Sequence, residues 1–342
     1  AVFMVGQPLL EGHGGPPDPE RLKRPLFGPL SAEHVTYLLS FVGVGAIFFV
    51  VQSSGLVGAL LGAGTVIVLG YLVWFMVTQC DRVERERMML ALVLVAGSVV
   101  FWALYEQGGS SLNQFAERNV DLRLWAGQSM TAAQAQSFQG AGILLLAPAI
   151  SALWAWLGGR GMDPNPMAKF SVGLLMVGAS FFVIVFGARF AGPDFKTPLV
   201  YLAVAYIIQT TGELFLSPVG LSEMTKLAPR ALVSTMMATW FLGTAGAQWL
   251  AAQIAALTAA DTVSGQVLDP GKSLATYNDV FLKIGAVGVA AGVLMLALSP
   301  WLKRWAHAAR PGHAVHPEPI APVLDGERQA VNPGVMRADR EA

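Results

Sequence analysis

Long apolar stretches dominate the chain, and short polar connections separate them. Eight such stretches can be distinguished, at residues 33–52, 55–79, 88–114, 137–158, 168–190, 198–225, 231–258 and 275–302. Each has about the length of the roughly 20 apolar residues that an α-helix needs to cross a lipid bilayer. The pattern therefore predicts an all-α integral membrane protein with eight spanning helices.

The segments on either side of this apolar region have a different composition. Residues 8–32 are rich in proline and glycine, which is typical of a connecting loop, and residues 1–7 resemble the end of a preceding helix. From residue 306 onward, proline, histidine and charged residues dominate without periodicity, which predicts a disordered tail. Because the chain begins at Ala1 without an initiator methionine, we expect it to be a fragment.

Lysine and arginine are concentrated in alternate connections between the stretches. One set of connections and ends contains Arg21, Lys23, Arg24, Arg82, Arg85, Arg87, Arg160, Lys226, Arg230, Lys303, Arg304 and Arg310. The opposite set contains fewer, namely Arg118, Arg123, Arg189, Lys196 and Lys272. Basic residues are enriched in cytoplasmic loops, so this asymmetry predicts that both ends of the eight-helix set are cytoplasmic.

The composition fits a membrane protein and argues against several other classes. Hydrophobic residues make up 54% of the chain, charged residues make up 13%, and the mean hydropathy is +0.54. The formal net charge is zero, so no overall field favours nucleic acid as a partner. No phosphate-binding glycine loop, metal-ligand cluster or nucleophile turn stands out in the sequence. We therefore expect no enzyme activity, no cofactor and no metal site.

Glu213 places a carboxylate within the sixth apolar stretch. A charge at the centre of a membrane helix costs roughly 2.5–3.5 kcal/mol on insertion scales, so such residues usually have a function. Spacings of four, three and four residues place it on one helix face with Tyr206, Thr210 and Ser217. Pro218 follows and predicts a bend. We interpret this face as the lining of a water-accessible cavity; the alternative is a purely structural carboxylate bonded to a neighbouring helix.

Glu106 occupies a comparable position in the third stretch. Trp102, Gly109 and Asn113 share its helix face by similar spacing. Gly108 and Gly109 remove side chains there, which permits close approach of a ligand or another backbone. A buried glutamate can carry a proton if its partner leaves and returns during a conformational cycle. The alternative is a static buried hydrogen bond.

The other notable side chains have simpler interpretations. Trp240, in the seventh stretch, could line an aromatic pocket, although its spacing favours packing in the core. Glu223 and Lys226 lie at the cytoplasmic end of the sixth stretch, and we expect an exposed pair there. Exposed pairs of this kind contribute little energy.

Three strings of sequence carry a resemblance to a known family. They are FWALYEQGGSSLNQFAERNVD at 101–121, GELFLSPVGLSEMTKLAPR at 212–230 and STMMATWFLGTA at 234–245. These strings closely resemble motifs of the proton-dependent oligopeptide transporters, which belong to the major facilitator superfamily. The resemblance extends over about 85–302, in the expected order and with matching spacing.

The resemblance implies an organisation for the chain. Bacterial members of the family have twelve core helices and two additional helices between the two halves. Residues 81–305 then correspond to the C-terminal six-helix bundle of a major facilitator-type fold, and 33–80 to the two inserted helices. Residues 1–32 correspond to the end of a preceding helix and a cytoplasmic linker, and 306–342 to a disordered cytoplasmic tail. The N-terminal bundle would be absent.

The resemblance also implies roles for individual residues. Glu213 matches the glutamate that holds the free amino group of the peptide, and Ser217 would face the same cavity. Glu106 matches a glutamate that takes part in proton coupling. Trp102 and Trp240 match aromatic residues that line pockets for peptide side chains.

The chain departs from the family pattern in two places. The eighth helix of the family usually opens with a string whose asparagine contacts the peptide backbone, whereas this chain reads SFQGAGILLLAP, with Gln139 as a possible substitute. The acidic and basic motif of the first helix, and the basic residues that hold the peptide carboxylate, belong to the half that we expect to be absent.

These observations lead to one expected function and two alternatives. We expect proton-coupled symport of di- and tripeptides across the cell inner (plasma) membrane by alternating access, with protons as the coupling ion. A major facilitator-type transporter of another small solute is the first alternative. The second is a truncated paralogue or sensor that does not transport.

Overall fold

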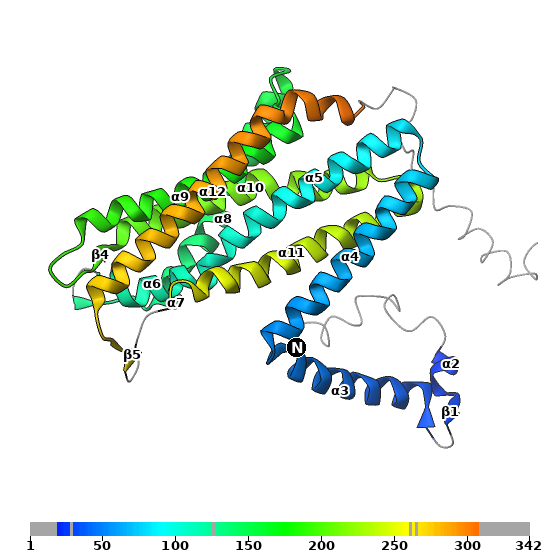
Figure 1. Cartoon of the computed structure of the whole chain (residues 1–342), viewed down its shortest axis with the longest axis horizontal. Helices are drawn as coiled ribbons and strands as arrows, with labels where there is room; N and C mark the ends of the chain where they lie inside the picture. Colours follow the sequence, from blue (N-terminus) through cyan, green and yellow to red (C-terminus); the bar gives the residue numbers. More distant parts are fainter. Residues whose placement is uncertain (1–18, 28–29, 125–126, 260–261, 264–265, 308–342) are drawn as a thin grey trace, which may run out of the picture.

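The structure is a computed structural model that describes the chain except for residues 1–18, 28–29, 125–126, 260–261, 264–265 and 308–342. In the described part, eight long helices form the fold (Figure 1). They are α3 (Ala32–Val51), α4 (Ser54–Thr78), α5 (Arg82–Tyr105), α8 (Ser137–Gly159), α9 (Pro166–Gly187), α10 (Leu199–Leu227), α11 (Val233–Ala256) and α12 (Pro270–Trp305). Each corresponds to one of the eight predicted apolar stretches.

Short elements connect the long helices. The helical ones are α2 (Pro19–Lys23), η2 (Glu106–Gly109), α6 (Ser111–Asn119), α7 (Ala132–Ala135), η4 (Ala188–Phe190) and η5 (Arg230–Leu232). The strands are β1 (Pro25–Phe27), β2 (Leu30–Ser31), β3 (Val120–Asp121), β4 (Thr197–Pro198), β5 (Thr262–Val263) and β6 (Gln266–Val267). They form three two-stranded pairs, of which β3–β4 is parallel and the other two are antiparallel.

Seven helical stretches of the described residues are long and apolar enough to cross a membrane. They are Ala32–Val51, Ser54–Thr78, Arg82–Asn119, Ala132–Gly159, Pro166–Phe190, Leu199–Leu227 and Pro270–Trp305. Helix α11 is not among them, because Thr244, Gln248, Trp249 and Gln253 lower its hydropathy. It nevertheless runs beside α5 in the bundle (Figure 1). Its expected membrane crossing remains a prediction.

The helices begin where the sequence supplies capping side chains. Asp81 accepts a hydrogen bond from the amide of Glu84, whose side chain returns to the Asp81 amide, so a complete capping box starts α5. Asn165 and Asp269 cap α9 and α12, and a proline follows each of them at the first helical position. Proline is favoured there because its missing N–H would be unpaired anyway.

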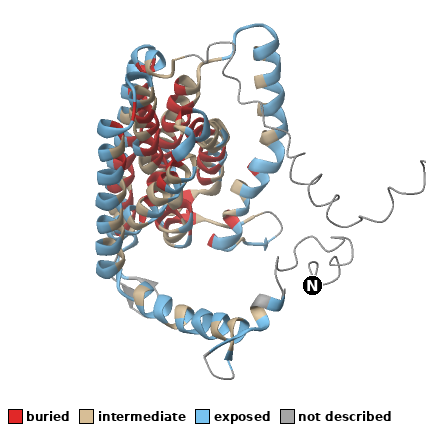
Figure 2. Cartoon of the chain, turned by 90° about the vertical axis from the view of Figure 1, so that its right-hand side faces the viewer, coloured by how far each residue is buried: buried red, intermediate tan, exposed pale blue. Residues whose placement is uncertain are grey.

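Helix α9 packs closely against α10 on one side and α12 on the other. A Cβ atom on Gly178 would lie 2.5 Å from the main-chain nitrogen of Val289, and one on Gly173 would lie 2.8 Å from the carbonyl oxygen of Gly212. Small residues let helix backbones approach closely in membranes, where packing drives association. These glycines therefore hold the three helices together, and the buried residues gather in this bundle (Figure 2).

Helices α3 and α4 project an apolar surface outward. No residue of α3 is buried, and α4 buries only Leu72 and Met76. Figure 2 shows both helices largely in the colour of exposed residues. Helix α4 touches α11, where the Trp249 indole donates to the carbonyl of Ser54 at 3.1 Å and its ring covers Gly58. The remaining apolar surface suits contact with lipid.

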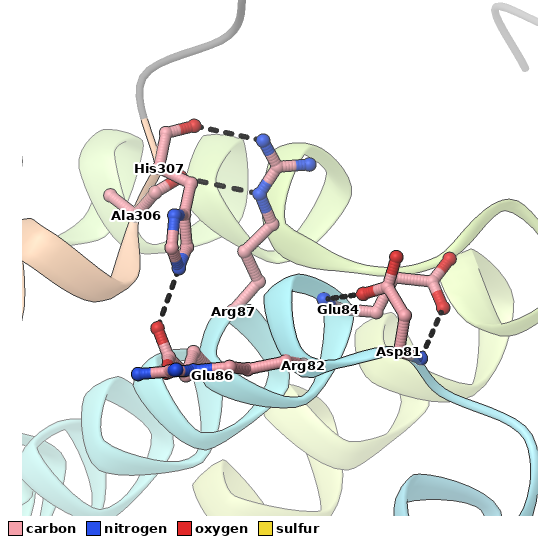
Figure 3. A network of polar contacts seen from close by, with 7 residues as sticks. All are labelled: Asp81, Arg82, Glu84, Glu86, Arg87, Ala306 and His307. Carbon is pink, nitrogen blue, oxygen red and sulfur yellow. Dashed lines mark hydrogen bonds and ion pairs between the residues drawn. The ribbon is translucent and has the colours of Figure 1, made fainter.

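A polar cluster joins the end of α12 to the start of α5 (Figure 3). The Arg87 guanidinium donates to the main-chain oxygens of Ala306 and His307 at 3.3 and 2.8 Å. The His307 ring lies 2.6 Å from Glu86, and Arg82 pairs with the same carboxylate at 2.9 Å. The tail predicted from residue 306 therefore begins with two residues that are anchored; the rest of it lies outside the described residues.

The third apolar stretch differs from its prediction. We expected one continuous helix, but α5 ends at Tyr105, a 3-10 turn covers Glu106–Gly109, and α6 begins at Ser111. Two adjacent glycines weaken the helix at this point. The prediction that one face of a single helix carries Trp102, Glu106, Gly109 and Asn113 is therefore wrong, because these residues are divided among α5, the 3-10 turn and α6. By contrast, α10 continues through Pro218.

Candidate functional site

The centre of the candidate site is a contact between α5 and α10. The hydroxyl of Tyr105, the last residue of α5, donates to Glu213 Oε2 at 2.5 Å. Both side chains are half-buried. A hydrogen bond to an ionised acceptor is shorter and stronger than one between neutral groups. Tyr105 therefore holds one oxygen of the membrane-embedded carboxylate in place.

Aromatic rings enclose this contact on the α5 side. The Tyr105 ring is stacked on Phe101, with 5.7 Å between centroids, and the Trp102 ring meets Tyr105 edge-on at 5.4 Å. Such arrangements fix the orientation of the Tyr105 ring. The role of Trp102 in lining a pocket for a peptide side chain remains a prediction.

Two buried polar atoms near the contact have no hydrogen-bond partner among the described residues. They are the indole nitrogen of Trp102 and the hydroxyl of Thr210, one turn before Glu213. Unpaired buried polar groups are rare in folded proteins and call for a ligand, water or another explanation. Thr210 shares the polar face of α10 with Glu213 and the Trp102 ring contacts Tyr105, so this region is one that a polar ligand could complete.

Glu106 follows Tyr105 directly and opens the 3-10 turn. Its carboxyl is half-buried and lies close enough to interact electrostatically with Glu213, and the amide of Gln248 on α11 is also near it. Within the described part of the chain, no lysine, arginine or histidine forms an ion pair with either glutamate. Two neighbouring acidic groups without a cation form a site whose charge is complementary to a cationic ligand.

Buried hydrogen bonds hold the 3-10 turn that begins at Glu106. Gln107 is fully buried; its amide donates to the carbonyls of Ala103 and Ala251 at 2.9 and 3.2 Å and accepts from Ser111 at 2.6 Å. These bonds link α5, α6 and α11. Gln107 was not singled out from the sequence, although a glutamine inside an apolar stretch is a signal of buried polar pairing.

The polar face of α10 runs from the core to the site. Tyr206 and Thr210 are buried, whereas Glu213 and Ser217 are half-buried. The Tyr206 hydroxyl lies 3.5 Å from the carbonyl of Gly108, so this face also contacts the turn after Glu106. The four residues occupy one continuous helix, as their spacing predicts. A ligand role for Ser217 remains a prediction.

Trp240 lies in the core rather than on an open surface. Only 2% of the residue is exposed, its ring covers Gly220 on α10, and it faces Phe170 on α9 edge-on at 6.5 Å. This is the packing arrangement that its spacing favoured. A role in a side-chain pocket is not visible in this conformation and stays a prediction.

Gln139, considered as a substitute for the family asparagine, is engaged within the bundle. Its amide donates to Gln209 at 3.3 Å, and Gln209 donates to Ser180 at 3.0 Å. It also lies directly against Gly108. The side chain thus connects α8, α10 and α9, and its polar atoms are used for packing these helices.

Comparison with known proteins identifies the family. The model of the POT family matches residues 36–274. The chain belongs to the POT family. The dipeptide and tripeptide permease A of Erwinia pyrifoliae is 32% identical over 312 residues, which cover 91% of this chain and 60% of that permease. The corresponding permease of Edwardsiella piscicida is 36% identical over 64% of this chain and 44% of its own length. The match to the Erwinia pyrifoliae permease covers most of this POT-family chain but only about 60% of the length of that permease.

Solved structures of POT-family transporters show the same architecture. A peptide transporter in complex with sulfate is 30% identical, with a TM-score of 0.63 over 82% of this chain and 56% of that one. A transporter in complex with a thioalcohol-conjugated peptide is 27% identical, with a TM-score of 0.59 over 80% of this chain and 56% of that one. The predicted all-α, major facilitator-type fold is confirmed, and the chain is a multi-pass membrane protein.

Proposed function

We propose that this chain forms part of a proton-coupled transporter of di- and tripeptides. The observation that carries the proposal is the Glu213 carboxylate, which is held inside a membrane bundle by Tyr105 and has no cationic partner among the described residues. Relatives at 32% and 36% identity are dipeptide and tripeptide permeases, which supports the substrate class. A peptide with a free amino terminus supplies the missing cation.

In this proposal, Glu213 and Trp102 bind the peptide. The peptide ammonium group pairs with the Glu213 carboxylate, because an isolated charge in a low-dielectric site is stabilised by an opposite charge. Trp102 supplies an apolar wall beside it and an indole N–H that has no partner among the described residues. Ser217 is half-buried on the same face of α10 as Glu213 and faces the same cavity, whereas Trp240 is buried and joins the cavity only if α11 moves during transport.

Glu106 serves proton coupling. Its carboxyl interacts electrostatically with that of Glu213, so the charge state of one affects the other. A proton on Glu106 removes a negative charge next to the peptide site, and its release restores that charge. Coupling between proton and peptide then follows from this proximity, with no cofactor required.

Transport requires a second bundle on the other side of the site. We propose that a six-helix N-terminal bundle completes the cavity and that the two bundles rock about the site in alternating access. The expected location is the cell inner (plasma) membrane. The distribution of basic residues supports cytoplasmic ends for the eight helices.

The proposal is tested by reconstituting the complete transporter that contains this chain into liposomes. An inward proton gradient should drive accumulation of radiolabelled dialanine, and a protonophore should abolish it. Excess unlabelled di- or tripeptide should compete, whereas a free amino acid should compete weakly. Equal accumulation of dialanine with and without the proton gradient would contradict proton coupling.

A different amine is the second candidate substrate. One POT-family transporter of known structure, 27% identical with a TM-score of 0.60, is in complex with 5-aminolevulinic acid. Such a compound also carries an amino group that Glu213 could bind. Uptake of radiolabelled 5-aminolevulinic acid, measured beside dialanine uptake in the same liposomes, distinguishes the two: if it is transported and dipeptides are not, the peptide proposal is wrong.

A further inference from the structure

We propose that Tyr105 is a positioning residue for substrate binding, which orients Glu213 so that one carboxylate oxygen faces the substrate amine. The inference rests on the proposed function and adds a residue to it. Tyr105 was not singled out from the sequence, because an aromatic residue in an apolar stretch is most often part of the core.

The first support is that only one of the two Glu213 carboxylate oxygens accepts a hydrogen bond from the described residues. Tyr105 donates to Oε2 of Glu213 at 2.5 Å, and the described residues supply no other hydrogen bond to this carboxylate. The remaining oxygen, Oε1, therefore keeps its lone pairs for an incoming ammonium group. One oxygen is fixed and the other is available, which is the arrangement that binds a cation without first breaking an internal bond.

The second support is that the tyrosine itself is held firmly. Its ring is stacked on Phe101 at an interplanar angle of 20° and meets Trp102 edge-on. The hydroxyl therefore has little freedom to follow the carboxylate; instead, the carboxylate must adopt the orientation that the hydroxyl offers. Fixing a binding group in advance improves affinity, because less conformational entropy is lost on binding.

The third support is the position of Tyr105 at the end of α5. The residue after it is Glu106, which opens the 3-10 turn. The same short segment thus contacts the Glu213 carboxylate and carries the second acidic group. A change at the turn would be transmitted directly to the orientation of Glu213.

A purely structural role predicts a different outcome. If the hydroxyl only joined α5 to α10, its removal would lower thermal stability and reduce the amount of folded transporter, with little effect on KM. A positioning role predicts a change in KM for amine substrates while kcat and stability are retained. The two roles can therefore be separated by kinetics.

The test is Tyr105→Phe in the complete transporter, measured as dialanine uptake in liposomes. Losing a hydrogen bond to a charged group should raise KM on the order of tenfold, with kcat within about twofold. Tyr277→Phe is the matched control, since it removes a buried tyrosine hydroxyl that pairs with Arg118 instead of a glutamate. An unchanged KM in Tyr105→Phe, or an equal rise in Tyr277→Phe, would overturn the inference.

A double-mutant cycle between Tyr105→Phe and Glu213→Asp gives a second test of the inference. Glu213→Asp keeps the charge and withdraws the carboxylate from Tyr105 by one methylene. Adding Tyr105→Phe to Glu213→Asp should then raise KM no further, because the bond is already lost. Independent, additive effects of the two changes would refute the coupling. Absence of dialanine uptake by the wild-type transporter would instead refute the proposed function.

Discussion

Arg87, in the first turns of α5, donates to the main-chain oxygen of His307, just beyond the end of α12, at 2.8 Å. The two residues are 220 positions apart in the chain. The guanidinium also reaches the carbonyl of Ala306, so it satisfies carbonyls at a helix end where no further helical N–H is available (Figure 3). This contact fixes one end of the bundle and gives the first prediction.

Arg87→Gln should loosen the end of α12. Loss of two charge-assisted bonds at a half-buried site should cost about 1–3 kcal/mol of local stability, so amides around residues 303–307 should exchange faster with solvent. Hydrogen exchange followed by mass spectrometry measures this. Arg123→Gln is the control, because Arg123 is 74% exposed and makes a surface pair with Asp121, away from the end of α12. Equal protection in both variants would contradict the anchoring role.

Gly178→Ala should destabilise the bundle strongly. Its Cβ would lie 2.5 Å from the main-chain nitrogen of Val289, and a backbone atom cannot move without separating α9 from α12. Overpacking of this kind costs about 1–3 kcal/mol. Gly70→Ala is the matched control, since nothing lies within 4 Å of that position. Thermal unfolding in detergent should show a lower midpoint for the first variant and a similar or higher midpoint for the second.

The pH dependence of uptake should come from Glu106 and not from the outer loops. Glu106→Gln removes the group that we propose to carry the proton, so uptake should lose its stimulation by a proton gradient while peptide exchange without a gradient persists. The measurement is dialanine uptake between pH 5.5 and 8, compared with exchange across the same membranes. Gradient-stimulated uptake in Glu106→Gln would contradict this role.

Asp121 provides the control for that experiment. The Arg123 guanidinium, 2.7 Å away, lowers the pKa of Asp121 from 3.8 to about 2. Because its pKa is lower in the folded state, the stabilisation by its charge is complete above about pH 4 and is lost only as the pH falls toward 2. Asp121 stays ionised throughout the transport range, so Asp121→Asn should leave the shape of the pH profile unchanged.

The sequence was sufficient to predict the helices but not their interruptions. Apolar length is a physical requirement of the bilayer, and each predicted stretch corresponds to a helix. The break after Tyr105 could not be predicted, because paired glycines are compatible with both a continuous membrane helix and a turn. Buried bonds made by Gln107 hold the turn, and they depend on distant residues such as Ala251.

The candidate site was predicted in part. Glu213 and Glu106 stand out because a charge in an apolar stretch is costly, and in the structure their carboxyls interact electrostatically. Tyr105 could not be distinguished from a core aromatic residue, because the sequence does not reveal that its hydroxyl bonds to Glu213.

The expectation for one charged pair at the end of α10 was wrong. Glu223 was expected to be exposed together with Lys226, yet its side chain is only 8% exposed. Burial of this kind depends on how the neighbouring helices cover the end of α10, which periodicity does not reveal.

The central claim is that Glu213 binds the amino group of the substrate. The most direct measurement is proton-driven dialanine uptake by the complete transporter carrying Glu213→Gln, with Glu117→Gln as a control at an exposed glutamate of α6. We predict that Glu213→Gln reduces uptake by about 100-fold or more, because the substrate ammonium loses its buried charge partner, while membrane insertion and the unfolding midpoint stay near wild type. Glu117→Gln should retain normal uptake. Normal uptake by Glu213→Gln would contradict the account.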